Sequence, residues 1–149
     1  MKTTNDMVIA QLQRVINRIL FLKKKSFFEF KGVAFYPSEI HLMLLIEEEI
    51  ATNATRMAEQ LGVTKGAVSQ TLARLEKKSV LKKRKDPYKK NELTLKFTPF
   101  GAKALEHYRE RAQELAEKHD RYLTHFSNDE KAVIQRFLVE VERVFDEMA

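Results

Sequence analysis

Residues 53–97 read NATRMAEQLGVTKGAVSQTLARLEKKSVLKKRKDPYKKNELTLKF, and the rest of the chain is organised around this stretch. It begins with an amphipathic pattern that predicts a short helix over 53–61, whose apolar face holds Met57, Ala58 and Leu61. Asn53 occupies the position where an N-cap side chain accepts a hydrogen bond from an unpaired backbone amide. Gly62 follows and permits the sharp turn that ends this helix.

A second helix is predicted directly after the turn, with Thr64 as its N-cap. Its apolar stripe consists of Val68, Leu72 and Leu75, and a different face carries Lys65, Ser69, Gln70 and Ala73. Two helices joined by a short turn that contains Gly form a helix-turn-helix, whose second helix enters the major groove of DNA. The polar face of the second helix is therefore the predicted recognition surface.

Two short strands are predicted after the second helix, over 81–85 and 92–97, because apolar and polar residues alternate in the second of them. The connection DPYKKN contains the turn formers Asp86, Pro87 and Asn91. A hairpin in this place is a wing, and its tip presents Tyr88, Lys89 and Lys90 to a phosphate backbone or a minor groove. These elements predict a module that binds double-stranded DNA.

The positive charge of the chain is concentrated in this module. The whole chain has a formal net charge of +6. Residues 55–98 contain 12 Lys and Arg against 4 Asp and Glu, which leaves 15 basic and 17 acidic residues elsewhere. A charge excess confined to one segment is typical of a protein that binds phosphates.

Composition and motifs argue against several other classes of protein. The 149 residues include no Cys, so disulfides and thiolate metal sites are impossible. There is no Gly-rich phosphate loop, no Gly-x-Ser-x-Gly elbow and no helical His-Glu-x-x-His pair, so we expect neither an enzyme nor a cofactor. No apolar run approaches the ~18 residues of a membrane span, and no apolar signal core stands at the N-terminus. We therefore expect a cytoplasmic protein without a membrane partner.

A helix over 7–24 precedes the module, and its apolar arc is too broad for a solitary surface helix. An aromatic-rich connection over 27–36 leads to a helix that begins at Pro37, where a missing amide costs nothing. The connection has two interpretations that stay open: a loop pinned to the core by its aromatic rings, or one wall of an effector pocket. The residues of such a pocket are Phe28, Phe35, Tyr36 and His41.

Two further helices are predicted after the wing. Thr98-Pro99 starts a helix that runs to about Leu123, and Ser127-Asn128-Asp129-Glu130 is a capping sequence for a last helix with a strong apolar stripe. We infer a homodimer in which the first helix and these two interlock with their counterparts; the alternative is that they fold back on their own domain. A two-fold dimer places its recognition helices about 34 Å apart, as adjacent turns of one duplex face require.

The predicted fold class is mainly α with a small β wing, a winged helix-turn-helix with N- and C-terminal dimerisation helices. Residues 1–35 form the N-terminal dimerisation helix and aromatic connection, 36–98 the DNA-binding module, and 99–149 the C-terminal dimerisation helices. The order of these elements resembles that of the MarR family of transcriptional regulators. Three segments also resemble the family: LGVTKGAVSQTLARLEKK, LKKRKDPYKKNELTLKFT and TPFG. The resemblance covers nearly the whole chain and implies a triangular homodimer, usually a repressor released by a small ligand or an oxidant.

The resemblance also implies which side chains contact DNA. On the recognition helix and its cap they are Thr64, Lys65, Ser69, Gln70 and Arg74, and on the wing we add Lys83, Arg84, Tyr88, Lys89 and Lys90. Gln70 suits adenine, and Lys65 suits guanine or a phosphate. The alternative role of Thr64 is to cap the helix without contacting DNA. The alternative role of Arg74 is to pair with a carboxylate of the protein.

The chain departs from the family pattern at two places. The wing usually carries an Asp-x-Arg pattern, and Lys89-Lys90-Asn91 stands there instead. Because lysine is a point charge, it discriminates groove geometry less well than an arginine fork does. Ser79 replaces the Gly that commonly follows the recognition helix.

Zinc-sensing members of that family draw attention to Glu39, His41, Glu106 and His107. Adjacent residues on a helix point about 100° apart, so Glu106 and His107 cannot easily serve one ion. The position one turn after His107 is Arg111, which is no ligand. We therefore expect no metal site.

The leading hypothesis is a sequence-specific transcriptional regulator, a repressor relieved by a small-molecule effector. The alternatives are an adaptor that binds an acidic protein through the winged module and a nonspecific architectural DNA binder. Retention on heparin without a shift of any duplex favours the adaptor. Equal affinity for scrambled duplexes favours the architectural binder.

Overall fold

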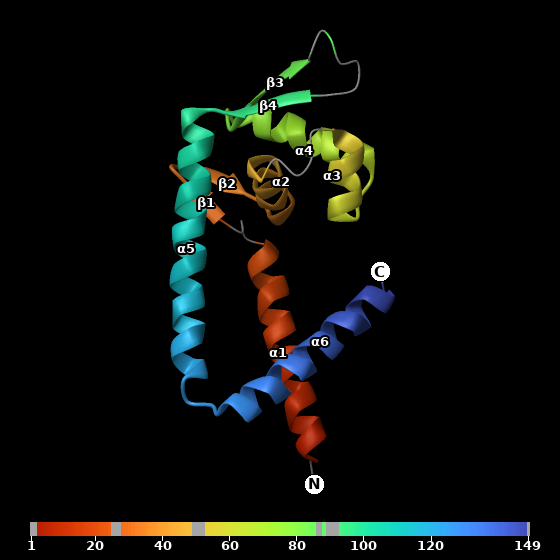
Figure 1. Cartoon of the computed structure of the whole chain (residues 1–149), viewed down its shortest axis with the longest axis vertical. Helices are drawn as coiled ribbons and strands as arrows, with labels where there is room; N and C mark the ends of the chain where they lie inside the picture. Colours follow the sequence, from red (N-terminus) through yellow and green to blue (C-terminus); the bar gives the residue numbers. More distant parts are fainter. Residues whose placement is uncertain (1–2, 25–27, 49–52, 86–87, 89–92, 149) are drawn as a thin grey trace. The chain divides into compact units, whose positions relative to one another are not determined.

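The computed structural model describes residues 3–24, 28–48, 53–85, 88 and 93–148 (Figure 1). The helices are α1 Thr4–Lys24, α2 Pro37–Glu47, α3 Ala54–Leu61, α4 Lys65–Lys77, α5 Pro99–Leu123 and α6 Asn128–Met148. The strands are β1 Phe28–Phe30, β2 Val33–Phe35, β3 Leu81–Lys85 and β4 Leu93–Phe97. The predicted fold class, mainly α with a small β wing, is confirmed.

α3, the turn and α4 form the predicted helix-turn-helix. The Asn53 side chain accepts a hydrogen bond from the Arg56 N–H at 2.9 Å, and Gly62 ends α3 in the left-handed region at φ 62°. Thr64 caps α4 by accepting a hydrogen bond from the Ala67 N–H at 3.1 Å. Both predicted caps and the turn glycine are therefore confirmed.

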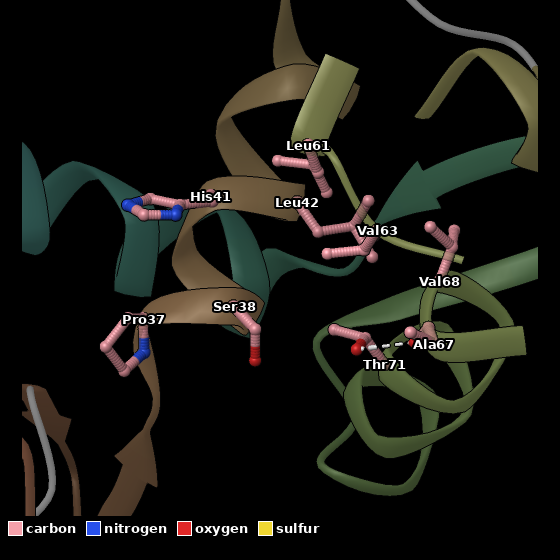
Figure 2. A pocket seen from close by; sticks show the side chains of 9 residues that line it. All are labelled: Pro37, Ser38, His41, Leu42, Leu61, Val63, Ala67, Val68 and Thr71. Atoms are coloured by element: carbon pink, nitrogen blue, oxygen red, sulfur yellow. Dashed lines mark hydrogen bonds between the residues drawn. The ribbon is translucent and has the colours of Figure 1, made fainter. Parts of the chain in front are cut away.

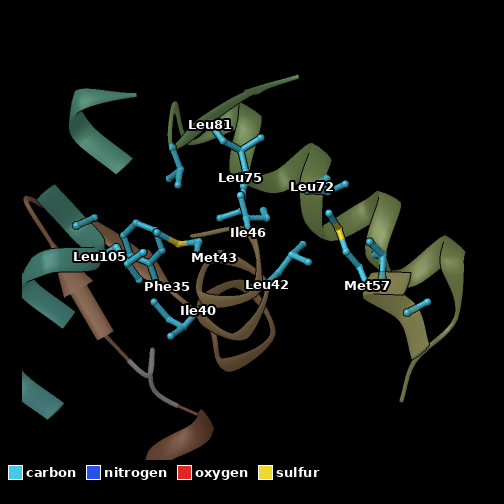
Figure 3. Packing of buried hydrophobic residues seen from close by; sticks show 14 residues of the cluster. Phe35, Ile40, Leu42, Met43, Ile46, Met57, Leu72, Leu75, Leu81 and Leu105 are labelled. Atoms are coloured by element: carbon cyan, nitrogen blue, oxygen red, sulfur yellow. The ribbon is translucent and has the colours of Figure 1, made fainter. Parts of the chain in front are cut away.

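The hydrophobic core lies where α2, α3 and α4 pack together (Figure 3). The predicted stripe of α4 is at most 1% exposed and consists of Val68, Leu72 and Leu75. Each such side chain stabilises the fold by about 1.5–3 kcal/mol relative to leaving it in water. β2 adds Phe35 to the core, and α5 adds Ala104 and Leu105. The core thus extends past residues 36–98 in both directions along the chain.

A β-hairpin stands where a loop was expected before α2. β1 pairs antiparallel with β2, and Phe28 lies opposite Phe35. The turn residues Lys31 and Gly32 both have positive φ, 47° and 78°, as a two-residue type I′ turn requires. The expectation of a loop was therefore wrong. The sequence did not reveal the hairpin because strands of three residues are too short for an alternating pattern to be recognised.

The segment TPFG joins the wing to α5. The backbone N–H of Thr98 donates to the Val80 carbonyl at 3.0 Å. The Thr98 hydroxyl donates to the Ser79 carbonyl at 2.5 Å, with a longer contact of 3.2 Å to the Val80 oxygen. The same hydroxyl accepts a hydrogen bond from the Gly101 N–H at 3.0 Å. A Cβ atom on Gly101 would lie 1.9 Å from the Val80 oxygen, so only glycine fits here. The motif fixes the start of α5 against the residue that precedes β3.

Two compact units make up the chain, residues 1–108 and 109–149. The first contains the helix-turn-helix, the wing and the β1–β2 hairpin (Figure 1). The second contains the C-terminal part of α5 and all of α6. Ser127 and Glu130 form the predicted capping box: each side chain accepts a hydrogen bond from the other residue's N–H, at 3.2 and 2.7 Å.

Apolar side chains remain exposed along α1 and α6. Those of α1 are 44–57% exposed: Met7, Val8, Ile9, Val15, Ile19, Leu20, Phe21 and Leu22. Those of α6 are 40–77% exposed: Val133, Phe137, Leu138, Val139, Val144, Phe145 and Met148. Among the residues described, no helix is both long and apolar enough to cross a membrane.

Candidate nucleic-acid interface

α4 presents one polar face to solvent and one apolar face to the core. Lys65, Ser69 and Gln70 are all exposed, and Lys65 and Ser69 are neighbours on the helix surface because they are four residues apart. The buried stripe on the other side holds the helix against α2 and α3. The recognition face predicted from the sequence is therefore available to a partner.

Thr64 can act both as a cap and as a contact. Its oxygen accepts the hydrogen bond of the Ala67 N–H, and the residue is exposed. A threonine hydroxyl has one donor hydrogen besides its acceptor lone pairs. The capping bond leaves that hydrogen available for a phosphate oxygen, so the two roles considered for Thr64 are compatible.

The Arg74 side chain contacts two other side chains of the protein, Glu39 and Thr71. Its Nε lies 3.6 Å from the Glu39 carboxylate, and its terminal nitrogen donates to the Thr71 hydroxyl at 2.9 Å. The Arg74 side chain is still 48% exposed. The pairing with a carboxylate considered for this residue is thus present, and it restricts how far the guanidinium can extend toward DNA.

Glu39 is the buried centre of this cluster. Both its carboxylate oxygens accept from the Lys78 ammonium, at 2.8 and 2.7 Å, and one also accepts from the Tyr36 N–H at 2.9 Å. Lys78 donates in addition to the Ala34 carbonyl at 2.7 Å. Since Lys78 follows directly after α4, these bonds tie the end of the recognition helix to α2 and β2. A carboxylate three residues after Tyr36 has the spacing of a capping box, so the sequence could have revealed the bond of Glu39 to the Tyr36 N–H but not its bonds to Lys78.

The two wing strands sort their basic residues onto opposite faces. Lys83 is half-buried; its N–H donates to Glu76 of α4 at 3.2 Å and its ammonium lies 3.9 Å from the same carboxylate. Lys82 lies opposite Lys96 in the register, and both are exposed, as is Arg84. Lys82 and Lys96 were not among the predicted contacts, although the period of two along a strand could have identified them.

The wing tip is described only at Tyr88, whose side chain is 94% exposed. Lys89 and Lys90, which were predicted to contact DNA, lie outside the described residues, as do the turn formers Asp86, Pro87 and Asn91. Tyr88 is therefore the residue of the tip that the structure places in solvent, where an aromatic ring can reach a nucleic acid backbone.

The four residues predicted to line an effector pocket lie in different surroundings. Phe35 is fully buried, and the Phe28 ring packs 5.7 Å from it, as in the interpretation that pins the connection to the core. Tyr36 is 48% exposed, with the Lys78 ammonium 5.1 Å from its ring centre. His41 points elsewhere and lines a cavity between α2 and α4 (Figure 2).

The residues considered as zinc ligands lie in unlike surroundings. Glu39 is bonded as described above, and the His107 ring packs 5.7 and 5.4 Å from Phe28 and Phe30. His41 and Glu106 are exposed. Within 3–24, 28–48, 53–85, 88 and 93–148, no group of three His, Cys, Asp or Glu side chains is placed to hold a metal ion.

Comparison with known proteins gives three results. The sequence model of the MarR family matches residues 35–90. The transcriptional regulator AdcR of Streptococcus pneumoniae is 27% identical over 106 residues, which cover 71% of this chain and 72% of AdcR. Two solved structures share the fold at 17% identity. FabT of Streptococcus pneumoniae, solved in complex with DNA, has a TM-score of 0.74 over 97% of this chain and 99% of FabT. The zinc-responsive ZitR of Lactococcus lactis has a TM-score of 0.70 over 93% and 99%.

Proposed function

The chain belongs to the MarR family, and we propose that it acts as a homodimeric repressor that binds operator DNA in the cytoplasm. Members of this family are transcription regulators and not enzymes, in agreement with the expectation drawn from the motifs. The proposed operator is an inverted repeat, because a two-fold dimer presents two identical recognition helices to one duplex.

The exposed polar face of α4 carries this proposal. This face consists of Lys65, Ser69 and Gln70. The buried apolar side chains of α4 fix the helix against the core, and the contact between Lys78 and Glu39 fixes its C-terminal end. Base reading requires side chains held on a rigid element, and phosphate contacts require positive charge nearby. Residues 55–98 supply that charge. FabT and ZitR, which share this fold, have both been solved with DNA.

We assign dimerisation to the segments 1–35 and 99–149, and DNA binding to 36–98. The exposed apolar residues of α1 and α6 support this division. Covering each large apolar side chain on association removes it from water, a gain of up to about 1.5–3 kcal/mol before the costs of association. A second copy of the chain offers the same apolar faces, so an isologous interface would cover the faces of α1 and α6 in both subunits.

A small-molecule effector that releases the operator completes the proposal. ZitR is described as zinc-responsive, but the donor groups of this chain do not fit a zinc site built from its candidate residues. There is no Cys, the Glu39 oxygens are bonded to Lys78 and Tyr36, and Arg111 stands one turn after His107. We therefore assign no step to zinc.

Selection of bound duplexes from a random pool tests the DNA-binding proposal. We expect one inverted repeat to be enriched, and its affinity to fall steeply with salt because lysine–phosphate contacts release counterions. Equal affinity for the selected and scrambled duplexes would favour the architectural binder. Retention on heparin with no duplex enriched would favour the adaptor. Either result would overturn the assignment as a sequence-specific repressor.

A further inference from the structure

Glu76 is an acidic residue on the side of α4 that carries the recognition face. It stands seven residues after Ser69, close to two full helical turns, so the two side chains leave the helix in nearly the same direction. Residues 55–98 contain only 4 Asp and Glu beside 12 Lys and Arg. A carboxylate in this place repels phosphates. It therefore weakens DNA binding unless it has a compensating role.

The Glu76 carboxylate joins α4 to β3, the wing strand that contacts this helix (Figure 1). It accepts a hydrogen bond from the Lys83 N–H at 3.2 Å, and its other oxygen lies 3.9 Å from the Lys83 ammonium. The two side chains are 36% and 30% exposed, so solvent weakens the ion pair. The hydrogen bond to the backbone is therefore the more important part of the contact.

The register of the wing makes the Lys83 N–H available to Glu76. The Thr98 N–H donates to the Val80 carbonyl, and β3 and β4 pair antiparallel in the same register. In an antiparallel ladder, residues whose N–H and C=O face the partner strand alternate with residues whose groups face away. The bonding at Val80 thus continues two residues on, at Lys82. The N–H of Lys83 points away from β4 and toward α4.

Two fixed points along β3 determine the direction of the wing. The first is Val80 at the base of the hairpin, whose N–H and carbonyl are both hydrogen-bonded. The second is Lys83, three residues or ~10 Å further along the strand. A hairpin held at one point can pivot about it, and a second contact stops the pivoting. Arg84 and Tyr88, which are both exposed, follow this second point.

We propose that Glu76 is a positioning residue that fixes the wing relative to the recognition helix through the Lys83 N–H. This inference rests on the proposed repressor function. Glu76 does not itself contact DNA; it holds the wing in the orientation in which the wing and α4 meet the same duplex. A wing that is oriented before binding loses less conformational freedom on binding. This gain exceeds the repulsion between the carboxylate and the phosphates.

Two substitutions of Glu76 test the proposal through the direction of their effects. Glu76→Gln removes the charge but keeps an oxygen that can accept from the Lys83 N–H, so operator affinity should equal or exceed that of the wild-type chain. Glu76→Ala removes the charge and the hydrogen bond, and affinity should fall roughly 2- to 10-fold, as expected for one hydrogen bond of ordinary strength. Fluorescence anisotropy measures both. Equal changes in the two variants, whether gains or losses, would overturn the proposal.

Glu59→Ala is the matched control. It removes a carboxylate from an exposed position of α3 in the same module, and operator affinity should stay unchanged or rise. Affinities are compared at a temperature at which urea unfolding shows every variant to be folded. A loss as large as that of Glu76→Ala would overturn the proposal, because any acidic residue of the module would then have the same effect.

A double-mutant cycle separates positioning of the wing from a general effect of Glu76 on the fold. Arg84→Ala removes a basic group from the wing and should weaken operator binding in the wild-type chain. In the Glu76→Ala chain the same substitution should weaken binding by a factor at least about twofold smaller, because the wing is no longer held in place. In the Glu76→Gln chain its effect should equal that in the wild-type chain. Additive effects of Glu76→Ala and Arg84→Ala would overturn the proposal.

Amide hydrogen exchange gives a readout that does not depend on DNA. In the DNA-free protein the Lys83 N–H should exchange faster in Glu76→Ala than in Glu76→Gln, because only the second variant keeps the acceptor. Equal exchange would overturn the contact on which the inference depends. If the wild-type chain binds no duplex selectively, the proposed repressor function fails, and the exchange rates still decide whether Glu76 fixes β3.

Discussion

The Lys78 ammonium lies 2.7 Å from the Glu39 carboxylate, and this contact joins the end of the recognition helix to α2. Glu39 is fully buried, while the Lys78 side chain is 23% exposed. A buried carboxylate is tolerated only when its charge is compensated and its oxygens are hydrogen-bonded. Lys78 meets both conditions, and Arg74 adds a second positive charge at 3.6 Å.

Lys78→Met should therefore destabilise the protein strongly. The substitution leaves the buried Glu39 carboxylate with the Tyr36 N–H and the more distant Arg74 guanidinium, and such a loss typically costs about 3–5 kcal/mol. Urea unfolding measures the change in the free energy of unfolding. The double variant Glu39→Gln/Lys78→Met should recover part of the loss, because no charge is then left buried. A loss below about 1 kcal/mol for Lys78→Met would show that the contact is not a structural requirement.

Ser79→Gly should raise stability. Ser79 has φ 58°, a left-handed conformation that costs a residue with a Cβ atom about 1–2 kcal/mol. Glycine removes this cost, but its greater freedom stabilises the unfolded chain by about 0.4–1 kcal/mol. The expected net increase in the free energy of unfolding, measured with urea, is about 0.5–1 kcal/mol. Ser79→Ala keeps the Cβ atom and should give no gain. Equal effects of the two substitutions would contradict this explanation.

The local features of the fold could be predicted from the sequence, and the long-range ones could not. The caps Asn53 and Thr64 and the range of α5, 99–123, follow from residues close together in the chain, and the structure confirms them. The bond between Glu39 and Lys78 joins residues 39 positions apart. No pattern within either helix identifies such a partner.

The same distinction explains the wing and the aromatic connection. The alternation in β4 predicted the hairpin, but the facing of Lys82 and Lys96 depends on the register between the strands. The packing of Phe28 against Phe35, His107 and Tyr108 depends on how β1 meets α5. The two interpretations of the connection could therefore be separated only in three dimensions.

Lys96→Glu should stabilise the wing and weaken DNA binding together. Lys82 and Lys96 are directly opposite in the register, where like charges destabilise and opposite charges contribute about 0.2–1 kcal/mol. Losing a basic group from this exposed face of the wing should lower the slope of log affinity against log salt by about 1 or more. Lys103→Glu makes the same charge change at an exposed position of α5. If both variants weaken DNA binding equally, the change in net charge explains the effect, and the wing face that carries Lys82 and Lys96 has no special role.

Phe137→Glu should convert the dimer into monomers. Phe137 is 40% exposed on the apolar face of α6, and a charge buried in an apolar interface without a partner is costly. Light scattering coupled to gel filtration measures the mass, and the affinity for a full inverted repeat should fall toward that for a half-site. Gln135→Glu introduces the same charge at an exposed polar position of α6 and should remain dimeric. A wild-type chain that is monomeric at micromolar concentration would overturn the assignment of these helices.

Gln70→Ala should reduce sequence preference more than it reduces DNA binding itself. An amide that bonds adenine through two hydrogen bonds discriminates against the wrong base by about 1–3 kcal/mol, whereas a lysine bonded to phosphate favours all duplexes alike. We therefore expect Gln70→Ala to lower the ratio of operator to scrambled affinity by roughly 5- to 150-fold. The double variant Lys89→Ala/Lys90→Ala should weaken both duplexes by a similar factor and reduce the salt slope. Fluorescence anisotropy at several salt concentrations separates the two effects, since one changes a ratio and the other a slope. If both variants kept wild-type affinity and slope, neither α4 nor the wing would be the surface that meets DNA.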